Sequence, residues 1–323
     1  MATACPGVGI QADYGAVLGD STHVPFERRY DKDHPPRLHV IFLDLSSDQA
    51  AANSDANWTL APDPLVSAVS GFRLDAALRA KPSVHGFATV APDYSCMPHT
   101  FEFAGHDGGG AQAGLNGPDV TVRLGLGRSS FYGKLIVASV AVGSSSPFYL
   151  LYDATAVPPA NWLTIGSRGG RGGRGSEGPA GGSGSSGAPG CPAQAGGSGG
   201  DGGGGGPGAP GGRGGTITII VPANQPYLAG LVDSRSPGGR GGPGGPGGPG
   251  GNGGRGGQGS LSPTGGHCPD AVDGPSGRQG PTGPDSYEGP RGPRPAIVTA
   301  NAQDVFGTTV PPVVQMLLSQ APN

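Results

Sequence analysis

Glycine recurs at every third position through four stretches of this 323-residue chain: 166–190, 196–215, 238–259 and 274–294. Only Ser286 breaks the series inside the last stretch. A helix with three residues per turn places every third residue along one edge, and polyproline II is such a helix. A disordered linker of similar composition has no reason to keep this phase. The phase therefore predicts built rods rather than a flexible linker.

Polyproline-II helices contain no internal hydrogen bonds, so the backbone groups of each rod need partners from neighbouring rods or from water. In 238–259 the second residue of every triplet is also glycine. Two of the three edges of the helix then carry no side chain, which favours a polyglycine-II-type bundle. Collagen differs, because both non-glycine positions of its triplet carry side chains. Only 274–294 has a collagen-like single-glycine pattern, which also suits an outer rod. The glycines expected to form close edges are Gly166, Gly169, Gly172, Gly175, Gly199, Gly202, Gly205, Gly241, Gly244, Gly247, Gly250 and Gly253.

Each stretch holds 20 to 25 residues, so matched rods joined by turns can lie antiparallel. A fifth, shorter candidate lies at 105–119. A bundle of glycine rods alone is only marginally stable, because ordering glycine costs much conformational entropy. Each hydrogen bond contributes a net stabilisation of only about 0.5–1.5 kcal/mol. We therefore expect support from flanking β-structure or from other subunits. The sequence leaves open whether the bundle closes within one chain or between chains.

Apolar runs before the glycine stretches predict β-strands. They lie at 37–46, 83–92, 119–127, 133–143 and 147–153, and a short helical turn is predicted at 74–80. Together they predict a β-rich, β-sandwich-like globular domain over 1–165, in which 105–119 is a glycine-rich insert.

Further apolar runs alternate with the glycine stretches, at 214–222, 226–237 and 295–303. They predict that 166–294 is a polyglycine-II bundle with interleaved strands, stacked as layers. The C-terminal strand and tail, 295–323, contain a helical patch at 313–318 that is expected to dock onto a neighbour. The predicted fold class is mostly β, combined with a polyglycine-II/polyproline-II helix bundle.

Four cysteines, two in each half of the chain, allow three disulfide pairings. The economical pairing joins Cys5 with Cys96 and Cys191 with Cys268. Disulfides indicate an oxidising compartment, whereas the first residues show no secretory signal. Lysis or unconventional export on one hand, and reduced thiols on the other, both stay open. The expected location is extracellular or on a cell surface.

Composition argues against several classes of function. A net charge of −3 does not favour a nucleic-acid or anionic-membrane partner, and no stretch approaches the roughly 18 apolar residues of a membrane span. Cys96, His99, His106 and Asp107 lie within twelve residues, but their spacing matches no zinc pattern. No arrangement for nucleophilic or acid–base catalysis stands out. We therefore predict no enzyme, no cofactor and no metal site.

Arg168, Arg171 and Arg174 repeat in the glycine phase of "SRGGRGGRGSEG". Arginine–glycine tails of this kind bind RNA when they are disordered and interleaved with aromatic residues. No aromatic residue occurs from Ser167 to Thr216. The arginines are thus expected to form a solvated row on one rod, which could contact a surface bearing phosphate or carboxylate groups.

The glycine-rich region 166–294 resembles polyglycine-II-bundle proteins, among them the tips of some long-tailed phage fibres and a glycine-rich insect antifreeze. It is also similar to collagen-like proteins of environmental bacteria, in which "SRGGRGGRG", "GGTITIIVPA" and "PYLAGLVDSRSPGG" occur in this order. Those proteins end in "PPGP"-like sequences where this chain has "GPRGPRP". The resemblance implies an architecture and brings no catalytic or binding residue.

Three functions fit these features. The first is a non-enzymatic structural protein that self-assembles as a homo-oligomer, as a subunit of an extracellular or cell-surface filament. The second is an adhesin or phage-fibre-tip-like module that contacts a cell surface or glycan through the turns between rods. Ice binding is the third, and the arginine row argues against it because an ice-binding face is weakly charged.

Overall fold

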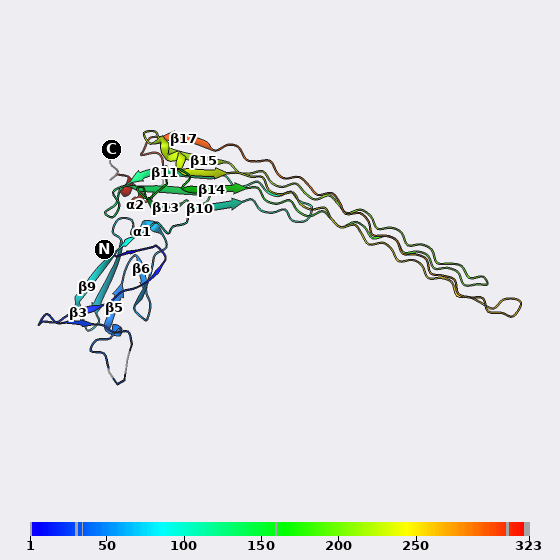
Figure 1. The fold of residues 1–323 in the computed structure, drawn as a ribbon, viewed down its shortest axis with the longest axis horizontal. Helices are drawn as coiled ribbons and strands as arrows, with labels where there is room; N and C mark the ends of the chain where they lie inside the picture. Colours follow the sequence, from blue (N-terminus) through cyan, green and yellow to red (C-terminus); the bar gives the residue numbers. More distant parts are fainter. Residues whose placement is uncertain (1, 30–31, 34, 159, 308–309, 320–323) are drawn as a thin grey trace.

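The computed structural model describes residues 2–29, 32–33, 35–158, 160–307 and 310–319. Figure 1 shows three parts: a small N-terminal body, a pair of packed sheets, and a long narrow projection of glycine-rich segments that run side by side. The described residues are mostly β, with few helices. This agrees with the β-rich part of the predicted fold class.

The N-terminal body is built from strands that, within the described residues, pair only with one another. One sheet has the order β1 (Thr3–Ala4), β9 (Lys81–Pro92), β8 (Phe72–Leu78), β5 (Leu43–Ser46), and a second has the order β2 (Gly9–Gln11), β7 (Asn57–Leu60), β6 (Ala50–Ala52). A ribbon of β3 (Gly15–Val17) and β4 (His23–Pro25) and a 3-10 turn, η1 (Val40–Phe42), complete it. Trp58 and Leu60 of β7 join Phe72, Leu74 and Val90 in its core.

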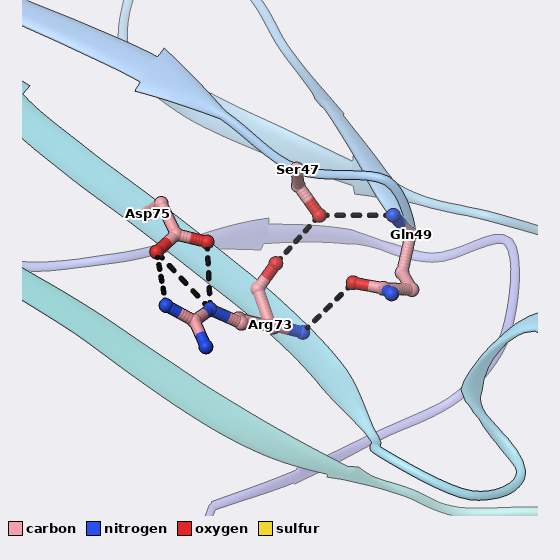
Figure 2. Close-up of polar contacts among 4 residues, drawn as sticks. All are labelled: Ser47, Gln49, Arg73 and Asp75. Atoms are coloured by element: carbon pink, nitrogen blue, oxygen red, sulfur yellow. Dashed lines mark hydrogen bonds and ion pairs between the residues drawn. The ribbon is translucent and has the colours of Figure 1, made fainter.

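Polar contacts fasten β8 to the short connection 47–49 between β5 and β6 (Figure 2). The Gln49 side-chain oxygen accepts from the Arg73 backbone N–H at 3.3 Å, and the Ser47 hydroxyl donates to the Arg73 carbonyl. The Arg73 guanidinium forms a forked ion pair with Asp75, with N–O distances of 2.9–3.1 Å. Its carbon also lies 4.3 Å from the centre of the Phe87 ring. These contacts are exposed, so we assign them to the local order of the sheet rather than to a site.

Two further sheets pack face to face beside the N-terminal body. The first is wholly parallel, in the order β10 (Thr100–Ala104), β14 (Leu163–Arg168), β16 (Val232–Arg235). The second has the order β13 (Phe148–Asp153), β12 (Leu135–Val142), β11 (Val120–Gly127), β15 (Ile217–Pro222), β17 (Ala296–Ala300), and β11, β15 and β17 are mutually parallel in it.

The core between these sheets is formed by alternate residues of their strands. Val122 of β11 and Ile219 of β15 meet Leu163 and Ile165 of β14, and the 3-10 segment η2 (Pro226–Leu231) closes the end. Each fully buried aliphatic side chain contributes roughly 1.5–3 kcal/mol. The sandwich is therefore a substantial anchor for what projects from it.

Two helices cover the outer face of the five-stranded sheet. They are α1 (Pro64–Ser67) and α2 (Pro312–Ser319). Val314 and Leu317 of α2 lie in one cluster with Leu135 and Val137 of β12 and with Phe306. The helix predicted at 313–318 is thus confirmed, but it docks onto its own chain because β12 leaves an apolar face to be covered.

Several sequence predictions need correction. The first domain was expected to end at residue 165, whereas the sheets divide between β9 and β10, and strands on both sides of residue 165 share the two later sheets. The helical turn at 74–80 is wrong: β8 pairs with both β5 and β9 there, and this pairing overrides the helix propensity of Leu and Ala. Of the expected strand at 37–46, Val40–Phe42 form η1 and only Leu43–Ser46 form β5.

Candidate functional site: the glycine-rich bundle

Four glycine-rich segments continue directly from the sandwich strands. We call them rod I (169–190, after β14), rod II (194–216, before β15), rod III (236–259, after β16) and rod IV (270–295, before β17). A short hairpin, 105–119, leaves β10 and returns into β11. Sheets and bundle therefore lie end to end (Figure 1), not stacked as predicted.

Rods that continue the same sheet are parallel and joined by backbone hydrogen bonds at every third residue. Over 169–190 every third N–H group of rod I donates to a carbonyl of rod III, from Gly169 to Pro237 at 3.1 Å through Gly190 to Gln258 at 3.1 Å. Rod II donates to rod IV in the same way, as from Gly202 to Arg278 at 2.8 Å. The sequence offset is constant along each pair, so the register set by the sheets is kept to the far end.

Rods that continue different sheets are antiparallel and bonded with the same period. Gly200 N–H donates to Gly182 in rod I at 2.7 Å, Gly251 N–H donates to Gly200 in rod II at 2.8 Å, and Gly277 N–H donates to Gly251 in rod III at 2.8 Å. The bundle thus has two layers, one per sheet, and each layer prolongs its sheet. It closes within one chain, which the sequence left open.

Close backbone approach explains why these positions are glycine. A Cβ added at any of the expected edge glycines except Gly166 would collide with a backbone carbonyl oxygen of a neighbouring rod. For Gly172 that oxygen belongs to Ala209, and for Gly247 to Gly280. Gly166 lies instead in β14, where a Cβ would meet the Glu102 side chain.

Asx side chains add a second bond at several in-layer contacts. Gly202 donates to the Arg278 carbonyl, and the preceding Asp201 carboxylate accepts the Arg278 N–H at 2.7 Å. The same exchange joins Asp107 to Arg171 at 2.7 Å and Asn116 to Arg213 at 3.0 Å. We call this arrangement the Asx clamp. Each of these three clamps holds the backbone of an arginine, and the clamps of Asp107 and Asn116 lie at the base of the bundle.

Other side chains of rod IV cover the outer N–H groups of rod III. Gly244 N–H donates to Asp285 at 2.8 Å, Gly256 N–H to Asp273 at 2.7 Å and Gly259 N–H to Asp270 at 2.7 Å; Gly253 N–H donates to the Ser276 hydroxyl at 3.4 Å. Charged acceptors make the stronger of these bonds. One outer edge of the bundle is therefore capped by the chain itself.

A disulfide between Cys191 and Cys268 staples the far end, with 5.4 Å between the Cα atoms. It joins the turn after rod I to the loop after rod III. The second disulfide, Cys5–Cys96, ties β1 to the segment that follows β9. Both pairings are those that the sequence predicted, and no described cysteine is free.

Arg168, Arg171 and Arg174 are exposed at three-residue spacing. Within the described part of the chain, none of them forms an ion pair. The backbone carbonyls of Arg168 and Arg171 accept from the hairpin, from Gly105 at 2.9 Å and Gly108 at 2.7 Å. The backbones of Arg168 and Arg171 therefore lie against the hairpin at the start of rod I.

The residues weighed as a metal cluster do not come together. Cys96 is in a disulfide, and the Asp107 carboxylate accepts a backbone N–H in an Asx clamp. Among the residues described, no three His, Cys, Asp or Glu side chains are grouped as metal ligands would be. No described helix has the length and apolarity to cross a membrane.

The strongest perturbation of a titratable group lies at the junction of the two bodies, away from the bundle. Burial raises the pKa of Tyr94, whose hydroxyl donates to the Pro64 carbonyl at 3.3 Å. Burial also raises the pKa of Tyr132, whose hydroxyl donates to the Pro92 carbonyl at 2.7 Å. Both rings are 5.6 Å apart and serve packing.

Comparisons with known proteins identified no relative of this chain. No family model, curated protein or solved structure matches the chain. Functional inference therefore rests on the geometry of the bundle.

Sequence reasoning missed the Asx clamps and the cap on rod III. The signal was present, since Asp107, Asn116 and Asp201 each precede an in-phase glycine. Two stretches between rods, 224–232 and 260–272, were the candidates for contacts; only the second lies at the far end, and 224–232 is built into η2 and β16 at the sandwich.

Proposed function

We propose that this chain is a non-enzymatic structural protein whose rods I–IV are polyglycine-II helices. Supporting this assignment are the backbone bonds at every third residue, since a three-residue repeat is the period of that helix. At a rise of about 3.1 Å per residue, rods of 22 to 26 residues span roughly 70–80 Å. We propose the same conformation for the arms of the 105–119 hairpin.

The proposed role is that of a rigid spike that holds its distal loop away from the sandwich and against a surface. One observation carries this: the bundle is closed and in register from the sheets to a disulfide at its far end. A stiff bundle of this length would hold the distal loop at a fixed distance from the sandwich. The disulfides support an extracellular or cell-surface location.

The contact region we propose is the loop 260–268. Leu261 is 73% exposed, and it forms an isolated bridge with His267. A solvent-exposed apolar side chain on a short, covalently pinned loop is suited to contact a glycan or protein on a cell surface. The arginine row 168–174 lies at the other end of the rods, so we propose no part for it in that contact.

The test uses the full non-reduced chain. A glycan array and whole-cell binding assay would compare the native protein with a variant in which 261–266 is replaced by Gly and Ser in equal number. We expect native binding to be lost in the loop variant while small-angle scattering shows an unchanged maximum dimension. Equal binding by both proteins, or no binding by the native protein to any surface tried, would refute the distal-loop proposal.

A filament subunit is the second candidate, and the edge strand β17 favours it. Ile297 and Val298 are 60% and 44% exposed on a strand that pairs only with β15 among the described strands. Such an edge invites pairing with another chain. Electron microscopy of the non-reduced protein at several concentrations discriminates: regular filaments with constant subunit spacing support this candidate, and discrete particles refute it.

A further inference from the structure

The outer face of the layer formed by rods I and III carries the side chains of one edge of each rod. In rod I, a Cβ added at Gly169 would meet rod II and one added at Gly170 would meet the hairpin. In rod III, a Cβ added at Gly238 would meet rod IV and one added at Gly239 would meet rod I. The third edge of each rod therefore faces solvent. Four exposed arginines lie on this face at the base of the bundle, and we call them the basic patch: Arg168, Arg171, Arg174 and Arg240.

The register between the two rods puts two of these arginines side by side. Arg235 of β16 is opposite Gly166 of β14, so five residues further along each chain Arg240 is opposite Arg171. The bond from Gly172 N–H to the Arg240 carbonyl at 2.9 Å fits this register. Neighbouring chains bonded in this way lie about 5 Å apart, and like charges directly opposite one another are destabilising. An anion that bridges the two guanidinium groups removes this repulsion.

The basic patch has no partner among the side chains that the structure describes. None of its four guanidinium groups forms an ion pair or a hydrogen bond within the described residues. Two carboxylates adjoin it. Asp107 accepts the Arg171 backbone N–H at 2.7 Å, and Glu177 follows Arg174 by one triplet. The patch thus presents unpaired positive charge on a chain whose net charge is −3.

The spacing of the arginines and the composition of the face narrow the class of anion. Arginines one triplet apart on a rod lie about 9 Å apart, at a rise of about 3.1 Å per residue. An extended β-linked uronate polysaccharide presents the carboxylates of one side once per disaccharide, at a comparable distance, and guanidinium groups bind carboxylates through paired hydrogen bonds. Single-stranded nucleic acid is disfavoured, because its bases stack on aromatic side chains and neither 169–216 nor 236–259 contains one.

We propose that the basic patch binds one chain of an acidic polysaccharide, which lies along rod I with a carboxylate held between Arg171 and Arg240. Carboxylates one disaccharide away on either side meet Arg168 and Arg174. The other two residues of each triplet are glycines turned into the bundle, so the polymer can lie close to the rod.

The remaining residues of this face suit a sugar chain. Pro237 and Pro243 of rod III are level with Arg168 and Arg174 of rod I, and they offer apolar contacts to the sugar rings. The patch is only two rods wide, which fits a single polymer chain better than the plane of a membrane. Binding there attaches the sandwich end of the projection to an acidic polysaccharide and leaves the distal loop 260–268 free.

The test is calorimetric titration of the full non-reduced chain with an oligomannuronate, at low and at physiological salt. A neutral cello-oligosaccharide of equal length is the reference ligand. We expect the oligomannuronate alone to bind, and to bind more weakly as salt screens the exposed charges. Arg171→Gln with Arg240→Gln should raise the dissociation constant at least about 10-fold, since two charge-assisted contacts are lost. The melting temperature should stay unchanged, because both side chains are exposed.

Arg255→Gln is the matched control. Arg255 is exposed on the same edge of rod III, but the register puts it level with Ser186 instead of an arginine. This variant should bind like the native chain. A loss as large as that of the double variant would show that overall charge, and not the patch, drives binding, and would overturn the proposal.

Other results would also overturn it. They are a native chain that does not bind the oligomannuronate, equal binding of the neutral ligand, native affinity in the double variant, or tighter binding to phosphatidylglycerol vesicles or polyphosphate. The proposal does not depend on the distal contact proposed above. Binding that the 261–266 loop variant keeps and the double arginine variant loses belongs to the basic patch, and binding with the reverse pattern belongs to the loop.

Discussion

Replacing Gly244 and Gly247 of rod III by valine should detach rod IV from the bundle. A Cβ at Gly244 collides with the Gly283 carbonyl oxygen, and one at Gly247 with that of Gly280. Neither obstacle is a flexible side chain, so rods III and IV must separate. The nearest bonds, from Gly283 N–H to Gly245 at 2.8 Å and Gly280 N–H to Gly248 at 2.9 Å, are then lost.

The expected loss of stability follows from the number of hydrogen bonds broken between rods III and IV. Two to four bonds lost at about 0.5–1.5 kcal/mol each destabilise the protein by about 1–6 kcal/mol. A typical free energy of unfolding is about 5–15 kcal/mol, so the loss is a large share of it. The branched valine side chain adds further overlap. We expect local opening of rod IV at moderate temperature, before the sandwich unfolds.

Two measurements test this change, and Gly182→Val serves as the control. Thermal melting by circular dichroism reports the loss of stability, and small-angle scattering reports the maximum dimension and the thickness of the rod. The control substitution adds the same side chain where a Cβ meets nothing within 4 Å. If the double variant melts with the native profile and keeps its rod, the argument from close backbone approach is refuted.

Three further predictions concern a clamp, a staple and a buried phenol. Asp201→Ala should lower the free energy of unfolding by about 1 kcal/mol in urea titration, whereas Glu177→Ala, a change at an exposed side chain of the bundle, should lie within about 0.5 kcal/mol of the native value. Opening the disulfide by Cys191→Ser with Cys268→Ser removes a closed loop of 77 residues, worth about 4.5 kcal/mol in the entropic model; hydrogen exchange should quicken at the distal triplets first, and uniform exchange would contradict this. Because burial raises the pKa of Tyr94, the folded state disfavours the phenolate, so its contribution to stability is full below about pH 10 and lost above it. Tyr94→Phe should therefore flatten the alkaline fall of the melting temperature, and an unchanged fall would exclude Tyr94 as its cause.

The sequence predicted best where the pattern was longest. The glycine phase located all four rods, and the runs at 83–92, 119–127, 133–143 and 147–153 became β9, β11, β12 and β13. An alternating pattern reflects a strand buried on one face and a continuous apolar run reflects a strand buried on both faces, so these strands could be predicted from their own residues.

Long-range pairing was beyond the local signals. The strand β14, which begins at Leu163, is short and runs into the glycine phase, so its pairing with β10 and β16 could not be read from its own residues. The domain boundary failed for the same reason: composition changes near residue 165, but the sheets are assembled from strands on both sides of it. The two disulfides were predictable because pairing within each half requires the shortest loops.

The constant register between rods makes the length of the bundle a modular quantity. Since each rod repeats every three residues, adding one triplet to each of rods I–IV would bring glycine opposite glycine again and restore every ladder. Such an insertion would lengthen the projection by about 9 Å without touching a residue of the sandwich. A protein built in this way can change its reach by duplicating triplets, while any insertion that is not a multiple of three would put side chains where only hydrogen atoms fit.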